Sequence, residues 1–294
     1  MTVVVNSSHQ LHAVTNPRWL VITLTLCLGI QALTTDLYLP SLPLITTELN
    51  SEVSRTQLTL SMLLVFFGLG QMLAGPLSDK FGRRPTLIAS LSLYALSAIG
   101  AALAESMTGL IIWRSLQGLF MSGSVVCARA LPRDLYAPDQ AAAAISKGLT
   151  GLGMIACISP VLGSLLVSWH GWRMTLFFLS LFGIFSLAWI IFRQPETIKQ
   201  RQPNALNLQT LWANWGLIIK NPQFRAYTLL SSASYGGLFV FLASSSFIFS
   251  KVFGQSPFTY GLWLIASSLC YISGTFLCRR LLKTMHIIHL KLYL

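Results

Sequence analysis

The chain alternates long apolar runs with short polar segments. A helix needs roughly 20 apolar residues to cross the hydrocarbon core of a bilayer. Eight runs reach that length, at residues 19–39, 57–77, 86–105, 107–131, 146–168, 172–192, 225–249 and 258–278. This pattern predicts an all-α polytopic membrane protein.

The composition supports the same prediction. Hydrophobic residues make up 54% of the chain and charged residues only 10%, whereas soluble domains carry about 25% charged residues. The net charge of +12 would favour nucleic-acid binding in a soluble protein, but no basic face is interleaved with aromatic residues, so no nucleic-acid partner is predicted. The five cysteines form no CxxC pair, and His286 and His289 have no carboxylate or cysteine nearby. We therefore predict neither a metal site nor a cofactor.

The basic residues indicate the orientation of the spans. With the N-terminus in the cytoplasm, 16 of the 20 lysines and arginines fall in cytoplasmic segments. Arg55, Arg173 and Lys251 fall in outer segments, and Arg114 lies inside a span. Such a bias is the positive-inside signal. It predicts a multi-pass protein of the cell inner membrane with a cytoplasmic N-terminus.

The spans divide the chain unevenly. We expect a cytoplasmic tail at 1–18, a six-helix bundle at 19–192, a cytoplasmic loop at 193–224, two further helices at 225–282 and an aberrant tail at 283–294. The loop opens with the polar, proline-bearing stretch RQPETIKQRQPN, as a linker between domains does. It then places apolar residues at helical spacing, which predicts a helix lying in the membrane interface: Leu208, Leu211, Trp212, Trp215 and Ile219.

A short charged stretch, GPLSDKFGRRP at 75–85, interrupts two apolar runs. Gly75 would let the preceding helix approach a neighbour, and Pro76 would help to end that helix. Gly82 would allow a tight reversal, and Pro85 suits the first turn of the next helix.

The charges of this stretch are also spaced for contact. Asp79 and Arg83 are four residues apart, so one helical turn brings them face to face. The stretch also contains the basic residues Lys80 and Arg84. The simpler alternative is an ordinary positive-inside loop.

The stretch 75–85 resembles the signature loop between helices 2 and 3 of the major facilitator superfamily. LIIWRSLQG at 110–118 resembles the fourth-helix motif of its proton-coupled antiporters. TTDLYLPSLP at 34–43 and SPVLGS at 159–164 resemble the Bcr/CflA branch of drug-efflux transporters. QPET after the sixth span is also typical of the family.

The resemblance implies a fold of two six-helix halves. This chain would then hold a complete N-terminal half and about two helices of the C-terminal half, and we expect it to be truncated. The fifth-span motif also departs from the family pattern: Ile155, Ser159 and Ser164 occupy glycine positions, while Pro160 and Gly163 are kept. By resemblance, Gly118, Pro160 and Gly163 serve helix packing or kinking.

Two ionisable residues lie inside predicted spans. Asp36 and Arg114 cost about 2.5–3.5 kcal/mol each at a helix centre, so such residues normally face an interior or a watery cavity. By resemblance, the first and fourth helices line one cavity, where the two residues would pair or share water and couple transport to protons. The alternative is that Asp36 caps turns at the mouth and Arg114 orders its helix. Gln117 either binds substrate or supports Arg114, and Gln31 is a further candidate for the cavity wall.

The resemblance gives the charged loop a separate role as a conformational latch. In the family, the residues matching Asp79 and Arg83 act with an acidic residue at the end of the fourth helix, which Asp134 matches. Further positions of the latch motif are Gly75, Gly82 and Arg84.

The function implied by the resemblance is export of small amphipathic compounds across the inner membrane in exchange for protons. An intramembrane enzyme is disfavoured, because the spans carry no pair of catalytic residues. A truncated, non-transporting remnant of an antiporter is the main alternative. The expected partners are substrate, protons and the lipid bilayer, and the sequence does not fix the oligomeric state.

Overall fold

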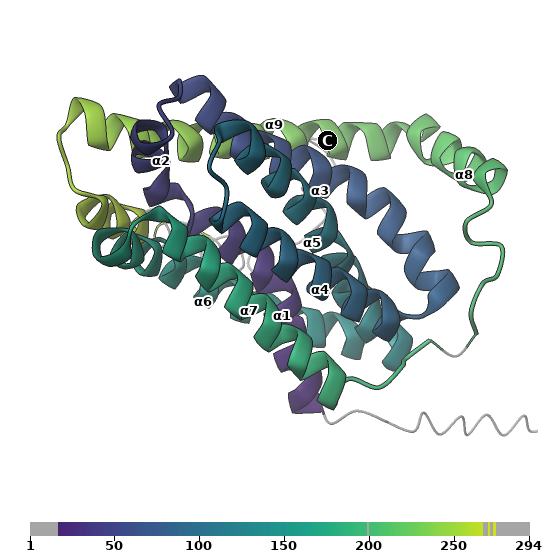
Figure 1. Cartoon of the computed structure of the whole chain (residues 1–294). Helices are drawn as coiled ribbons and strands as arrows, with labels where there is room; N and C mark the ends of the chain where they lie inside the picture. Colours follow the sequence, from purple (N-terminus) through teal and green to yellow (C-terminus); the bar gives the residue numbers. More distant parts are fainter. Residues whose placement is uncertain (1–16, 199, 267–269, 271–272, 275–294) are drawn as a thin grey trace, which may run out of the picture.

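The computed structural model of the chain describes residues 17–198, 200–266, 270 and 273–274. Its helices in chain order are α1 Pro17–Asp36, η1 Leu39–Ser41, α2 Leu42–Glu48, α3 Val53–Phe81, α4 Arg83–Ala102, α5 Met107–Leu135, α6 Pro138–His170, α7 Trp172–Arg193, α8 Leu208–Lys220, α9 Pro222–Phe247 and the π-helical turn η2 Ile248–Val252. Residues 257–266 form a further helix. The all-helical fold is therefore confirmed (Figure 1).

The apolar runs correspond to the long helices. Within the described residues, seven helical segments are long and apolar enough to cross a membrane, and they match the first seven predicted runs. The first run ends differently from the prediction, because α1 stops at Asp36 and prolines then start η1 and α2. The eighth run, 258–278, begins as the 257–266 helix, and much of it, like the histidines and the tail at 283–294, lies outside the described residues.

The first six long helices pack as one bundle. α1 packs mainly on α6, α3 on α5, and α4 on both α5 and α7. We call the end that carries the α3–α4 turn the Gly82 end, and the opposite end, where η1 and α2 lie, the α2 end. Buried residues form one cluster toward the α2 end, around Tyr38 and Trp172, and a second toward the Gly82 end, around Leu24 and Val125.

Close helix contacts in the bundle depend on glycine. A Cβ at Gly118 of α5 would overlap the backbone carbonyl of Leu63 in α3, and a Cβ at Gly163 of α6 would overlap that of Leu37. Backbone atoms cannot rotate away as a flexible side chain does, so these two contacts require the smallest residue.

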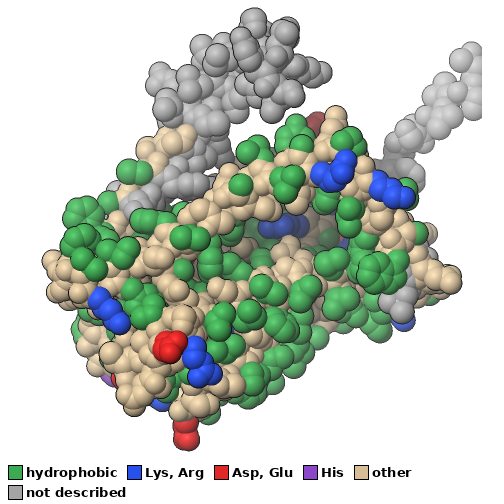
Figure 2. All heavy atoms as spheres, turned by 90° about the horizontal axis from the view of Figure 1, so that it is seen from above, with side chains coloured by type: hydrophobic (Ala, Val, Ile, Leu, Met, Phe, Trp, Pro, Cys, Tyr) green, Lys and Arg blue, Asp and Glu red, His purple; other side chains and the backbone are tan. Residues whose placement is uncertain are grey.

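α9 contacts the bundle at the α2 end. Ala243 and Phe247 are buried there, and Gln57 Nε2 donates to the carbonyl of Ala243 at 3.4 Å. The other half of α9, residues 222–238, is exposed, as is much of α8. Figure 2 views the molecule from above Figure 1, the side on which α9 lies, and shows a largely hydrophobic face with a hollow in it.

Candidate functional site

Arg114 lies in the middle of the bundle, and its side chain is completely buried. Its Nη1 donates to Gln117 Oε1 at 2.7 Å, one turn along α5, and its Nη2 donates to the backbone carbonyl of Thr34 in α1 at 3.2 Å. The guanidinium carbon lies 4.1 Å from the centre of the Tyr38 ring. The first and fourth spans, α1 and α5, thus lie close together as expected, and Arg114 connects them.

Two tyrosines near this arginine are fixed by hydrogen bonds to neighbouring helices. Tyr38 donates from its hydroxyl to Thr59 Oγ1 in α3 at 3.1 Å, which fixes the ring beneath the guanidinium. The hydroxyls of Tyr94 in α4 and Thr34 lie 2.7 Å apart. The sequence interpretation missed Thr34, Tyr38 and Tyr94. TTDLYLPSLP contains two of them, but their contact with Arg114 depends on helix packing that local spacing does not reveal.

Arg114 has no carboxylate partner in the described part of the chain. A buried charge is costly unless it is paired or hydrogen-bonded, and here an amide oxygen, a carbonyl and an aromatic ring take the place of a counter-ion. Two buried nitrogens, Arg114 Nε and Gln117 Nε2, have no hydrogen-bond partner among the described residues. The packed helices leave both side chains without exposed surface, so the expected place of Gln117 on a cavity wall stays a prediction.

Asp36 is half-buried at the end of α1, between Thr34 and Tyr38, the two α1-side residues that contact Arg114. It accepts a hydrogen bond from Thr35 Oγ1 at 2.9 Å and does not pair with Arg114. Asp36 is therefore separate from Arg114 in its side-chain hydrogen bonding, although both belong to the same part of the bundle.

Gln31 lies about one turn before Asp36 and is also half-buried. Its Nε2 donates to the hydroxyl of Tyr235 in α9 at 3.4 Å. Gln31 thus faces α9.

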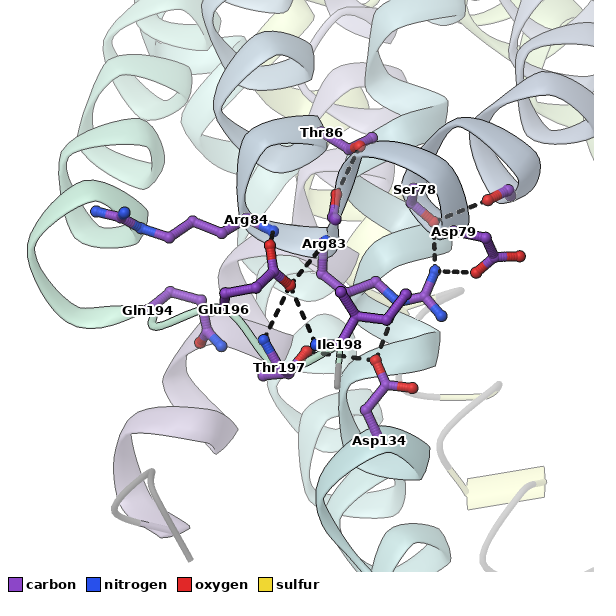
Figure 3. Close-up of polar contacts among 12 residues, drawn as sticks. Ser78, Asp79, Arg83, Arg84, Thr86, Asp134, Gln194, Glu196, Thr197 and Ile198 are labelled. Carbon is purple, nitrogen blue, oxygen red and sulfur yellow. Dashed lines mark hydrogen bonds and ion pairs between the residues drawn. The ribbon is translucent and has the colours of Figure 1, made fainter. Parts of the chain in front are cut away.

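The charged stretch 75–85 forms a compact polar cluster at the Gly82 end (Figure 3). Arg83 Nη1 contacts Asp79 Oδ1 at 2.6 Å and Ser78 Oγ at 2.5 Å, and its Nε contacts Asp134 Oδ2 at 3.0 Å. The contact of Asp79 with Arg83 is thus as expected, although the two residues lie on different helices. Arg83 connects the end of α3, the start of α4 and the end of α5.

Glu196 in the linker was missed as a member of this cluster. Its Oε1 accepts from the backbone N–H groups of Arg83 at 3.0 Å, Thr197 at 2.9 Å and Ile198 at 3.1 Å, and its Oε2 accepts from that of Arg84 at 3.2 Å (Figure 3). Two of these donors belong to the first turn of α4, whose N–H groups have no intrahelical acceptor. The available signal was that Glu196 is the only acidic residue after position 139.

The linker makes further bonds to the same cluster. Thr197 Oγ1 donates to Asp134 Oδ2 at 3.3 Å, and the N–H of Gln202 donates to the carbonyl of Asp79 at 3.0 Å. Arg84 Nη2 donates to the carbonyl of Ile191 at the end of α7 at 2.9 Å. The start of the linker is therefore fastened to the loop between α3 and α4.

The structure corrects two details of this stretch and supports two others. Pro76 does not end its helix, because α3 continues to Phe81. Gly75 makes no close approach, since a Cβ there would meet no described atom within 4 Å. Gly82 has φ +110°, which only glycine adopts readily, and it separates the helices as predicted. Pro85 lies in the first turn of α4.

The motif in α6 lies beside the other candidate residues. Pro160 is inside α6, and Ser159 Oγ donates to the carbonyl of Ile155 at 2.6 Å. A Cβ at Gly261 would come within 2.6 Å of Ser164 Oγ. This part of α6 therefore touches the 257–266 helix closely although serine replaces the family's glycine at 164.

Comparison with known proteins agrees with this architecture. A family model described as Major Facilitator Superfamily matches residues 24–292. A bicyclomycin resistance protein homolog of Haemophilus influenzae is 30% identical over 246 residues, which are 83% of this chain and 62% of that protein. A chloramphenicol resistance protein of Pseudomonas aeruginosa is 37% identical over 212 residues, which are 71% and 49% of the two chains.

A solved structure shares the fold. The bacterial homolog of the human lysosomal transporter Spinster, in an inward-facing and occupied conformation, gives a TM-score of 0.72 at 16% identity and covers 88% of this chain and 60% of that chain. The present chain spans about three fifths of the length of such relatives. The matched family model and the shared helical fold lead to one conclusion: the chain belongs to the Major Facilitator Superfamily.

Proposed function

We propose that this protein exports small amphipathic compounds across the cell inner membrane in exchange for protons, by alternating access. Export is supported by relatives that are named for resistance to bicyclomycin and chloramphenicol. The observation that supports proton coupling is the buried Arg114, which has no counter-ion among the described residues and lies beside the segment of α1 that bears Asp36.

In this mechanism Asp36 takes up and releases the proton. Arg114 contacts the residues on both sides of it, Thr34 and Tyr38. Burial favours the protonated form of a carboxylate, whereas polar surroundings favour the ionised form. Closing the empty site around Asp36 would therefore bind a proton, and entry of substrate would release it. Gln31 and Gln117 are proposed as polar contacts for substrate or as supports of this site.

The position of α9 is consistent with one state of the transport cycle. α9 meets the first bundle near the α2 end, through Gln57 and Ala243, while its other half is exposed. In the alternating-access scheme, two bundles rock around a site between them. We infer a conformation open toward the Gly82 end.

We propose that the cluster at the Gly82 end acts as the latch on this motion. It comprises Gly75, Asp79, Gly82, Arg83, Arg84, Asp134 and, in addition to the sequence expectation, Glu196. Arg83 shares its charge between two carboxylates, and Glu196 ties the linker to α4. Movement of the linker would thus be transmitted to the turn between α3 and α4. Gly118, Pro160 and Gly163 are proposed to let helices pack and bend during the cycle.

The bias of basic residues supports a cytoplasmic Gly82 end and N-terminus. On this orientation the linker at 193–224 is cytoplasmic, and α8 lies at the inner membrane surface. The family relationship favours a transporter over an enzyme. The resistance proteins among the relatives likewise favour export over the alternative of a non-transporting remnant.

Expression in a host that lacks its own efflux pumps tests the proposed function. The minimum inhibitory concentrations of chloramphenicol and bicyclomycin should rise with the wild-type protein and return to the host level with Arg114→Ala. Arg55→Ala is the matched control, since it removes an exposed arginine at the α2 end. Unchanged resistance despite normal amounts of wild-type protein in the membrane would contradict export of these compounds.

A further inference from the structure

A cavity of about 540 Å³ opens at the α2 end, apart from both Arg114 and the latch. One wall is apolar, with Pro40, Pro43 and Leu44 from η1 and α2. The facing wall consists of Ser246 in α9 and of the chain from η2 into the 257–266 helix. The volume of the cavity lies within the range of small-ligand sites.

Ser246 carries an unexplained polar group at this cavity. The residue is 2% exposed, and its Oγ has no hydrogen-bond partner within the described part of the chain. Two other hydroxyls around the cavity are satisfied: Ser168 Oγ donates to the carbonyl of Ser164 at 2.8 Å, and Ser256 Oγ accepts from the N–H of Thr259 at 3.2 Å. A buried hydroxyl without a partner is costly, and a bound ligand would supply one.

The charge on the cavity wall is positive. Lys251 is the charged residue that lines it, and this side chain is exposed and forms no ion pair within the described residues. It sits in η2, a single π-helical turn of the kind often found at functional sites. Gly254, with φ +61°, then turns the chain so that Ser256 returns to the cavity.

The 257–266 helix adds a second electropositive feature. It begins at the cavity wall, where Ser256, Pro257 and Tyr260 line the space. The helix dipole favours an anion at this end, although Pro257 has no N–H and the N–H of Thr259 already donates to Ser256 Oγ.

Two carboxylates near the cavity limit where an anion can lie. Glu48 follows the lining residue Thr47 but is engaged by Trp172 Nε1 at 2.7 Å and by Arg173 Nη1 at 3.3 Å. Asp36 accepts a hydrogen bond from Thr35 Oγ1 at 2.9 Å. An anion is therefore expected beside Lys251 and Ser256, where the cavity wall carries its positive charge.

We propose that this cavity binds a compact anionic group, a phosphate or carboxylate, between Lys251, the Ser246 hydroxyl and the N-terminus of the 257–266 helix. The group belongs either to a soluble molecule or to a lipid headgroup, since both carry the same chemistry. The site stands independently of the proposed export activity, because it rests on none of the residues assigned to coupling or to the latch.

Equilibrium dialysis of the purified full chain with radiolabelled inorganic phosphate, at constant ionic strength, tests the proposal. We expect saturable binding that Lys251→Gln weakens about tenfold or more and Ser246→Ala weakens about three- to tenfold, the losses typical of a charge-assisted and a neutral hydrogen bond. Lys220→Gln, which removes the same charge at the end of α8, should bind phosphate as the wild type does. Ser246→Ala should also keep the wild-type melting temperature in the absence of phosphate, because its hydroxyl has no partner to lose.

The same binding measurement in lipid nanodiscs identifies the source of the anion. If nanodiscs containing phosphatidylglycerol abolish phosphate binding and nanodiscs of phosphatidylcholine alone do not, the group is a lipid headgroup; binding retained in both indicates a soluble ligand. Absence of saturable binding, binding unaffected by Lys251→Gln, or an equal loss in Lys220→Gln would each refute the site.

Discussion

Replacing Glu196 by alanine should loosen the start of α4 without unfolding the bundle. The carboxylate accepts four backbone N–H groups, two of them from Arg83 and Arg84 in the first turn of α4. Because Gly82 supplies no side chain to cap that turn, the linker residue performs the capping from more than 110 positions away. Alanine would leave these donors to water.

The expected cost follows from known capping energies. Loss of a capping side chain costs about 1 kcal/mol, and loss of a negative charge at a helix N-terminus adds about 0.3–1 kcal/mol. We therefore expect Glu196→Ala to cost about 2 kcal/mol locally, which corresponds to roughly a 30-fold change in an opening equilibrium. Glu196→Gln keeps one acceptor oxygen but loses the charge, so its effect should be about half as large in free energy.

Hydrogen exchange measured by mass spectrometry provides the assay. Peptides covering residues 82–90 should exchange roughly 30-fold faster in Glu196→Ala, with Glu196→Gln in between. Glu105→Ala, which removes an exposed carboxylate at the α2 end, should match the wild type. Unchanged exchange at the start of α4 in both Glu196 variants would refute the capping role.

Three further predictions concern packing, charge and orientation. Gly118→Ala should lower the free energy of unfolding in detergent by about 1–3 kcal/mol, whereas Gly153→Ala, where a Cβ would meet no described atom within 4 Å, should not destabilise the protein; equal effects would contradict the close contact of α3 with α5. Arg114→Lys should abolish drug resistance in the pump-deficient host, because a lysine lacks the planar fork that bonds two acceptors at once; full resistance would show that charge alone suffices. A reporter fused after Gln202 should indicate cytoplasm and one fused after Glu48 periplasm, and exchanged signals would overturn the orientation.

The sequence predicted those features that depend on local pattern. Apolar runs of about 20 residues marked the spans, and helical spacing of apolar residues in the linker marked α8. Gly82 was identified as the turn because only glycine suits a sharp reversal between two charged helix ends. The resemblance also named Arg83 and Asp134, which the structure places 3.0 Å apart.

The missed features depend on contacts between distant segments. No periodicity connects Glu196 with Arg83 and Arg84, which it caps across more than 110 residues. The surroundings of Arg114 likewise include a carbonyl and a ring of the α1 region, whose contact with α5 depends on helix packing that local spacing does not reveal. Pro76 was misread because a proline inside a long helix can be tolerated when surrounding helices hold the segment in place.

The claim that Asp36 couples substrate to protons can be tested by measuring proton release when drug binds to the purified protein in weakly buffered detergent solution. The wild type should release protons on addition of a compound to which it confers resistance. Asp36→Asn, which keeps the shape of the side chain but cannot ionise, should bind the compound and release none, while Asp139→Asn, an exposed carboxylate at the Gly82 end, should behave as the wild type. Proton release of wild-type size from Asp36→Asn would contradict the proposed coupling.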